Sequence, residues 1–165
     1  MNIKKIHCIL FTTKKIGSVT LNIRIDGCKV GKVRHTKFLG VYIDEKLNWK
    51  KHISHINGKI SRGMGILRKV RKVLPASCLK TLYHTMIYPY YTYCNYVWGN
   101  SSFETLKPIY YKQKACVRII TMSKSREHTE PLFKKLNLLQ LNEINKYVYY
   151  KSVYSQSSSC IQIMN

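Results

Sequence analysis

The spacing of apolar residues changes along the chain, and the first part follows the two-residue period of β-strands. Residues 3–12 form a short apolar run that predicts a buried strand. From Val19 to Ile25 apolar and polar residues alternate, and the segment ends at Asp26-Gly27, a pair that accepts the positive φ angles of a tight hairpin turn. A further strand is predicted from Lys37 to Ile43, where Gly40 leaves room for a bulge or for close approach of another backbone.

After Leu47 the apolar residues recur every three or four positions, which is the period of an α-helix. Asn48 is expected to cap this helix. Gly63 and Gly65 fall inside it and are expected to mark a bend or a close contact, because glycine weakens a helix. The predicted buried stripe consists of Ile53, Ile56, Ile60, Met64, Leu67, Val70 and Leu74.

Further helical patterns follow in the second half of the chain. A second helix is expected to begin near Pro75, to kink at Pro89 and to stop at Gly99. Its tyrosines are expected to pack between helices rather than to stack on bases. Additional helices are predicted at 106–120, just after Thr129, and at 142–154.

These patterns together predict an α+β protein. A small N-terminal antiparallel β piece with a hairpin occupies residues 1–47, and a mainly α-helical, bundle-like region occupies residues 48–154. Residues 155–165 are rich in serine and are expected to form a disordered tail.

The charge balance points to a polyanionic partner. The 165 residues include 29 Lys and Arg against 7 Asp and Glu, a formal net charge of +22. Since neutralising phosphates releases condensed counterions, nucleic acid is the expected partner. No acidic residue occurs between Lys46 and Glu104, so the basic side of the first long helix has no acids to pair with. The candidate binding residues are Lys51, Arg62, Arg68, Lys69, Arg71 and Lys72.

Other chemistry finds little support. Two-metal nucleotidyl transfer needs several converging carboxylates, whereas Asp44-Glu45 is an isolated pair whose neighbouring side chains point apart in a strand. His52-x-x-His55 lacks further metal ligands, and the six cysteines have no zinc-type spacing, so they are expected to be reduced thiols packed as small apolar groups. We therefore predict no catalytic residue, metal site or cofactor in this chain.

The sequence also argues against a membrane protein. Its most apolar long window, 79–98, contains Lys80, His84, Pro89 and Asn95, and such groups are costly in hydrocarbon. No secretory signal pattern opens the chain. We expect an intracellular protein, in the nucleus or a cytoplasmic ribonucleoprotein.

An ordered series of short motifs resembles the carboxyl-terminal part of the reverse transcriptase of a non-LTR retrotransposon (a LINE element), most similar to jockey-like elements. The resemblance covers about residues 1–150. It rests on Lys37-Phe-Leu-Gly-Val-Tyr-Ile-Asp44, Leu47-Asn-Trp-Lys-Lys-His-Ile53, Leu74-Pro75, Leu82-Tyr83, Ile87-Tyr-Pro-Tyr90, Tyr93-Cys94, Val97-Trp98-Gly99, Gln113-Lys-Ala115, Arg118-Ile-Ile120, His128-Thr129 and Pro131-Leu-Phe133.

The resemblance implies specific roles. Phe38-Leu39-Gly40 would form the primer-grip hairpin, and the helices from Trp49 onward would form the thumb that holds an RNA–DNA hybrid or a DNA duplex. The family's catalytic aspartates, which bind Mg²⁺, would lie upstream. The chain would then be a truncated element that binds template–primer, makes no DNA by itself, and has the missing palm as a natural protein partner.

Two alternatives remain open at this point. The chain could instead be a domesticated, non-enzymatic module that binds RNA, DNA or another protein, using the Tyr-rich second helix. A weaker alternative is a basic amphipathic helix at an anionic membrane surface.

Overall fold

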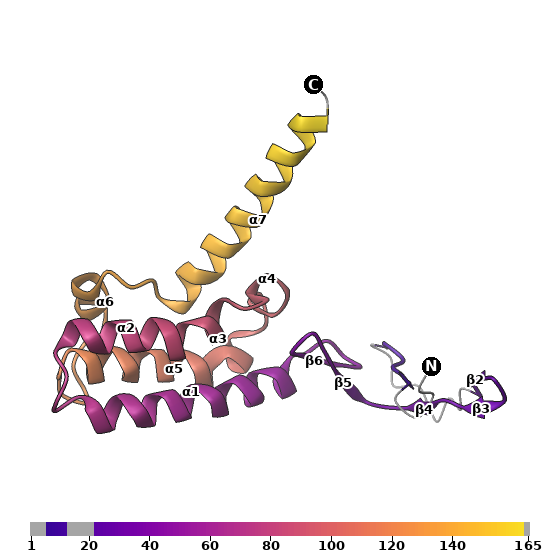
Figure 1. Ribbon diagram of the computed structural model, residues 1–165, viewed down its shortest axis with the longest axis horizontal. Coiled ribbons are helices and arrows are strands. Elements are labelled where there is room, and N and C mark those ends of the chain that lie inside the picture. The colour runs from indigo at the N-terminus through magenta and orange to yellow at the C-terminus, as the bar shows by residue number, and fades with distance from the viewer. Residues whose placement is uncertain (1–5, 13–21, 164–165) are drawn as a thin grey trace. The chain divides into compact units, whose positions relative to one another are not determined.

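The computed structural model describes residues 6–12 and 22–163, with side chains through residue 154 (Figure 1). The chain divides into two compact units, Met1–His52 and Ile53–Asn165. Short strands make up the first unit and helices the second, which confirms the α+β class.

The N-terminal unit is built from short strand pairs. Antiparallel pairing joins β2 to β3 and β5 to β6, whereas β1 and β4 are parallel, so the predicted all-antiparallel piece is wrong in this detail. The described part of the predicted 3–12 strand is reduced to two residues, and Val19 to Leu21 lie outside the described residues. The strands are β1 His7–Cys8, β2 Arg24–Ile25, β3 Cys28–Lys29, β4 Gly31–Lys32, β5 His35–Phe38 and β6 Val41–Asp44.

Both antiparallel pairs close through two residues with positive φ. Asp26 (48°) and Gly27 (74°) form the predicted turn. The segment predicted as one strand from Lys37 to Ile43 is instead a hairpin, in which Leu39 (44°) and Gly40 (84°) turn the chain. Leucine seldom adopts this conformation, so residue preference alone gave no signal for the second turn.

The helices of the second unit largely follow the predicted periodicity. Their bounds are α1 Lys50–Val70, α2 Ala76–Met86, α3 Tyr88–Thr92, α4 Asn95–Trp98, α5 Phe103–Ile120, α6 Glu130–Leu136 and α7 Leu141–Ile163. The α7 helix continues past Tyr154, where the sequence predicted its end, and residues 155–163 contain no proline or glycine that would stop it. In the described residues no helix is long and apolar enough to cross a membrane.

The predicted second helix is three helices rather than one kinked helix. Ile87 leaves helical geometry between α2 and α3, two residues before Pro89. In a continuous helix Pro89 could not donate an N–H to the Thr85 carbonyl and its ring would crowd that carbonyl, which favours a break at this point. Cys94 then adopts a left-handed conformation before α4. Pro75 is the N-cap of α2 rather than a first-turn residue.

The core lies among α1, α2 and α5, which pack together in the second unit (Figure 1). The stripe on α1 is confirmed, since Ile53, Ile56, Ile60, Met64 and Leu67 are buried. Val70 and Leu74, at its end, are half-buried.

At Gly63 the backbone of α1 lies close to the side chain of Ile87. A Cβ placed on Gly63 would lie 2.7 Å from Cγ1 of Ile87, whereas a Cβ on Gly65 would meet nothing within 4 Å. Gly63 therefore marks the predicted close contact, and Gly65 does not.

Three buried polar side chains of the core, those of Tyr91, Trp98 and Gln113, have hydrogen-bond partners. The Tyr91 hydroxyl donates to the Ile109 carbonyl at 3.0 Å, and Trp98 Nε1 donates to the Tyr93 carbonyl at 3.0 Å. Gln113, fully buried on α5, donates from Nε2 to the Leu139 carbonyl and accepts the Leu141 N–H at Oε1 (2.8 Å). These bonds fix the start of α7 to α5 and satisfy groups that are costly to bury alone.

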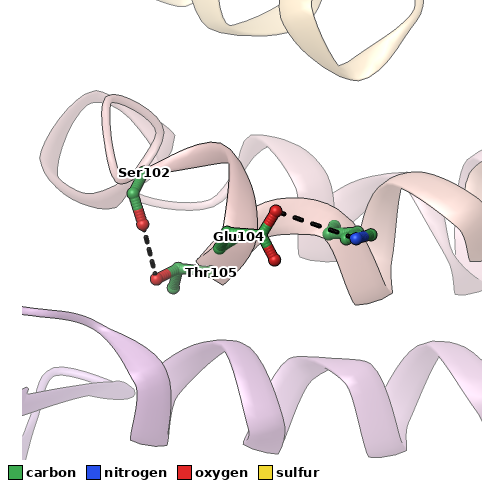
Figure 2. Close-up of polar contacts among 4 residues, drawn as sticks. Ser102, Glu104 and Thr105 are labelled. Carbon is green, nitrogen blue, oxygen red and sulfur yellow. Dashed lines mark hydrogen bonds and ion pairs between the residues drawn. The ribbon is translucent and has the colours of Figure 1, made fainter.

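The start of α5 shows how the few acids are used. The Ser102 hydroxyl meets the Thr105 hydroxyl at 3.0 Å (Figure 2), and Glu104 pairs with Lys107 at 3.7 Å. A carboxylate in the first turn of a helix also interacts favourably with the helix dipole.

Candidate nucleic-acid interface

The outer side of α1 carries Arg62 and Lys69. Both are exposed, and at about 100° per residue they lie on one side of the helix, opposite the buried stripe around Ile60. Neither makes an ion pair or a side-chain hydrogen bond with any described residue. Arg62 and Lys69 therefore have cationic groups available for an external anion.

The other predicted residues near the end of α1 point elsewhere. Arg68 is exposed, but its charge acts on the Cys116 thiol of α5 and so lies toward that helix. Arg71 is half-buried in the turn after α1, and Lys72 is exposed in the same turn. Arg68 therefore lies on a different side of α1 from Arg62 and Lys69.

Lys51 belongs to the N-terminal unit. It is exposed in the first turn of α1 and lines a cavity of about 310 Å³ together with Lys50, Asp44 and Glu45. Two carboxylates therefore share its surroundings, unlike those of Arg62.

Asp44, at the end of β6, organises the chain reversal before α1. Its Oδ1 accepts the N–H groups of Lys46 and Asn48 at 3.1 and 3.2 Å, and its Oδ2 accepts the N–H of Trp49 at 3.0 Å. Asn48 Oδ1 accepts the N–H of Lys50, the first residue of α1, so Asn48 lies one position before the N-cap, which is Trp49, and the predicted cap is off by one residue. These bonds hold Trp49 at a positive φ of 62°. They give Asp44 a local structural role.

The basic residues of α5 differ from those of α1. The helical period of 106–120 predicts that Lys107, Lys112, Lys114 and Arg118 point outward, yet each has a partner. Lys112 Nζ donates to the Asn57 carbonyl of α1 at 3.0 Å and to the Ser61 hydroxyl, and partial burial lowers the pKa of Lys112. Lys114 lies over the Tyr110 ring at 4.4 Å, and Arg118 donates to the Glu127 carbonyl at 2.9 Å. The expectation for Lys112 is wrong because its long side chain reaches across to a neighbouring helix.

The Phe38-Leu39-Gly40 segment forms the tip of the β5–β6 hairpin. Phe38 pairs with Val41 across the turn, and the side chains of Phe38 and Leu39 are 62% and 73% exposed. Two large apolar side chains at a hairpin tip are unusual on a polar surface and are available for contact.

The tyrosines and cysteines divide between core and surface. Tyr83 and Tyr91 are fully buried, as the packing interpretation predicts, whereas Tyr93 and Tyr96 are exposed. Cys116 is buried, and burial raises the pKa of its thiol to about 12. The expectation of packed thiols is wrong for Cys28 and Cys78, which are exposed. Each lies near a break in regular structure, where the apolar period gives no burial signal.

Within the described residues no three His, Cys, Asp or Glu side chains gather as a metal site. The acids serve local structure instead. Besides Asp44, Glu127 Oε2 accepts the Lys124 N–H, Glu143 Oε2 accepts the Gln140 N–H, and Glu130 pairs with Lys134 at 3.4 Å.

The comparison with curated proteins gives one informative match. Over 152 residues, 89% of this chain, the sequence is 26% identical to the "Probable RNA-directed DNA polymerase from transposon X-element" of Drosophila melanogaster. The chain spans 16% of that relative's length. No protein-family model matches the chain, and no solved structure does. The chain is therefore related, at low identity, to an RNA-directed DNA polymerase of a transposon.

Proposed function

We propose that this chain is the primer-grip and thumb region of a non-LTR retrotransposon reverse transcriptase, and that it holds template–primer nucleic acid. The observation that carries the proposal is the pair Arg62 and Lys69 on the outer side of α1, exposed and unpartnered among the described residues. The match to a transposon polymerase supports the same assignment.

The α1 face would bind by neutralising phosphates. Arg62 and Lys69 are two helical turns apart, about 10 Å along the axis, so they would meet different phosphates. Each such contact would release counterions and add to the salt dependence of binding. Lys51, in the first turn of α1, would add a contact nearer the start of the helix. Arg68, Arg71 and Lys72, the other residues predicted to bind, would contact phosphates away from the outer side of α1.

The hairpin tip would support the primer. Gly40 at φ 84° has no side chain, so a sugar–phosphate backbone could approach the turn closely, and Phe38 and Leu39 offer apolar contact beside it. In this proposal the hairpin positions the 3′ end, and carboxylates outside the chain carry out the transfer.

This chain alone is proposed to be inactive. Among the described residues Asp44, Glu127 and Glu143 accept backbone N–H groups, and no three His, Cys, Asp or Glu side chains gather, so the described acids do not fit a Mg²⁺ site and no step is assigned to a metal here. A primer-extension assay with Mg²⁺ should give no product, and nucleotide incorporation would contradict the proposal. The place of action would be the nucleus or a cytoplasmic ribonucleoprotein, with the palm as protein partner.

The binding face is tested by the salt dependence of affinity. Fluorescence anisotropy with an RNA–DNA hybrid and with a DNA duplex gives log Kd against log salt for wild type and for the double variant Arg62→Gln/Lys69→Gln. We expect the duplex slope to fall by about 2, since each lost contact contributes about 0.9.

The matched control removes two positive charges elsewhere. Lys107→Gln/Lys134→Gln changes net charge equally but acts on lysines already paired with Glu104 and Glu130. Equal slopes for the two double variants would show that total charge, and not the α1 face, determines binding.

A second candidate function, a protein-interaction module, is favoured by the exposed side chains of Tyr93, Tyr96 and Val97 around α4. Light scattering distinguishes the two. We would favour protein contact over template–primer binding if the wild-type chain forms an oligomer that dissociates on Val97→Ser substitution. Addition of nucleic acid should then leave the oligomer unchanged.

A further inference from the structure

A cavity of about 360 Å³ lies beside α7, in the second unit. Its lining is Asn100, after α4, together with Asn142, Asn145, Lys146, Tyr149 and Tyr150 of α7. The α7 residues recur at the three- and four-residue spacing of one helix side. The volume is near the lower end of the roughly 300–1,000 Å³ range of small-molecule sites.

The asparagines of this cavity have two different roles. Asn145 is structural, because its Oδ1 accepts from Asn95 Nδ2 at 2.7 Å and its Nδ2 donates to the Gly99 carbonyl at 2.8 Å. Asn100 and Asn142 are exposed, and their amides make no hydrogen bond within the described part of the chain. Two side-chain amides thus offer free donors and acceptors at one opening.

An aromatic surface stands next to these amides. The Tyr149 ring is stacked with Tyr96 of α4, with centroids 6.2 Å apart and planes at 15°. Tyr150 meets the edge of Tyr149 at 5.9 Å and 72°. The Tyr149 ring is therefore held by two neighbours, although 47% of the residue remains exposed.

The charge of the lining is positive. Lys146 is its charged residue, and no acid lines the cavity. Glu143, on the same turn of α7, directs Oε2 to the Gln140 N–H at 2.7 Å. An anion approaching Lys146 thus meets no lining carboxylate.

We propose that this cavity binds one unpaired nucleotide of a single-stranded nucleic acid. The base stacks on Tyr149, the amides of Asn100 and Asn142 bond its edge, and Lys146 contacts the adjoining phosphate. Unpaired bases expose both their faces and their hydrogen-bonding edges, which suits this combination of groups. A base inside a duplex has both faces stacked and its Watson–Crick edge paired, so this cavity beside α7 would bind a different ligand from the α1 face. The inference rests on the proposed function and adds single-strand recognition to it.

The test uses the full chain. It changes the aromatic ring of Tyr149 without changing the net charge, so it separates the contribution of stacking from that of charge. Anisotropy with labelled rU₁₂ and dT₁₂, and with a blunt DNA duplex, compares wild type with Tyr149→Ser and Tyr149→Phe. We expect Tyr149→Ser to weaken single-strand binding about tenfold. Tyr149→Phe, which keeps the ring, should stay within about twofold of wild type.

The matched control is Tyr111→Ser, which removes an exposed tyrosine of α5 outside the cavity. It should leave single-strand affinity unchanged, and duplex affinity should be unchanged in every Tyr variant. Asn142→Leu should weaken single-strand binding without altering the duplex. Circular dichroism checks that the variants remain folded.

The outcomes separate the two proposals. Equal effects of Tyr149→Ser and Tyr111→Ser, or equal losses for single strand and duplex, would overturn the cavity assignment. A wild-type chain that binds single strands in a Tyr149-dependent way but ignores duplex would instead overturn the α1 proposal and leave the cavity standing.

Discussion

At the scale of single residues, what surrounds a side chain decides its role. Gly63 and Gly65 are two positions apart on α1 and equally unfavourable for a helix, yet only Gly63 faces Ile87. The same contrast separates Lys112, which bonds to α1, from Lys69, which faces outward without a partner among the described residues.

The glycine pair gives a direct stability test. Gly63→Ala should lower the free energy of unfolding by about 1–3 kcal/mol, because the new Cβ would lie 2.7 Å from Ile87 Cγ1. Gly65→Ala should raise it by about 0.5–1 kcal/mol through better helix propensity. Urea denaturation measures both, and a stabilised Gly63→Ala variant would show that α1 and α2 are not this close.

Sequence reasoning at this scale predicted positions better than contacts. Periodicity placed Ile60 and Leu67 correctly in the core because burial of an apolar side follows helix geometry. It placed Lys112 on the surface, because nothing in a period shows that a lysine reaches the Asn57 carbonyl of a helix distant in sequence.

At the scale of elements, local backbone chemistry set the boundaries. The sequence predicted one helix from near Pro75, kinked at Pro89 and stopping at Gly99, but the left-handed residue Cys94 divides it again, and cysteine is not a residue whose preference signals that conformation. The residue pattern gave no sign of the β5–β6 hairpin, since Leu39 is a poor residue for its turn, and only the resemblance implied a hairpin at Phe38-Leu39-Gly40.

The positive φ of Leu39 in the β5–β6 turn allows a test that separates the stability of the hairpin from its binding to a primer. Leu39→Asn creates Asn-Gly, the favoured pair for a turn with two positive φ angles, and should stabilise the hairpin by about 1 kcal/mol. If Leu39 contacts the primer, binding of a primer–template duplex should weaken although the hairpin is more stable. Anisotropy and thermal melting measure the two effects, and unchanged affinity would argue against contact by this side chain.

Burial of the Cys116 thiol in α5 predicts alkaline lability. Its pKa rises from 9.0 to about 12 on folding, so the folded thiol keeps its proton while the unfolded thiol ionises. Stability should be full below about pH 9 and should then fall, by at most about 1.4 kcal/mol per pH unit for this group, as pH rises toward 12.

Urea unfolding between pH 8 and pH 10 measures this slope. Cys116→Ala should flatten it, whereas Cys78→Ala, at an exposed thiol, should leave it unchanged. A wild-type chain equally stable at both pH values would contradict the burial of Cys116. Burial also raises the pKa of Tyr83 and Tyr91, which extends the loss of stability to higher pH.

At the scale of the whole molecule, the positions of the acidic and basic residues matter as well as their numbers. Asp44, Glu127 and Glu143 bond to backbone N–H groups at turns and near a helix start, and no acid occurs between Lys46 and Glu104. Composition therefore predicted a polyanionic partner, and the helical period already placed Arg62 and Lys69 opposite the buried stripe. The structure adds that both are exposed and that neither has a partner among the described residues. The cavity beside α7 escaped prediction because Asn100 and Tyr149 are brought together only by folding.

The bonds of Asn95 and Gln113 decide where the polypeptide can be cut. Asn95 donates to Asn145, 50 residues downstream, and Gln113 accepts from Leu141. An expression fragment ending before residue 140 would leave Gln113 Oε1 without the Leu141 N–H and Asn95 Nδ2 with only the Tyr91 carbonyl of its two partners. A buried polar group left unpaired costs about 1–3 kcal/mol. During synthesis on the ribosome, likewise, these two interior sites are completed only after the beginning of α7 has been translated.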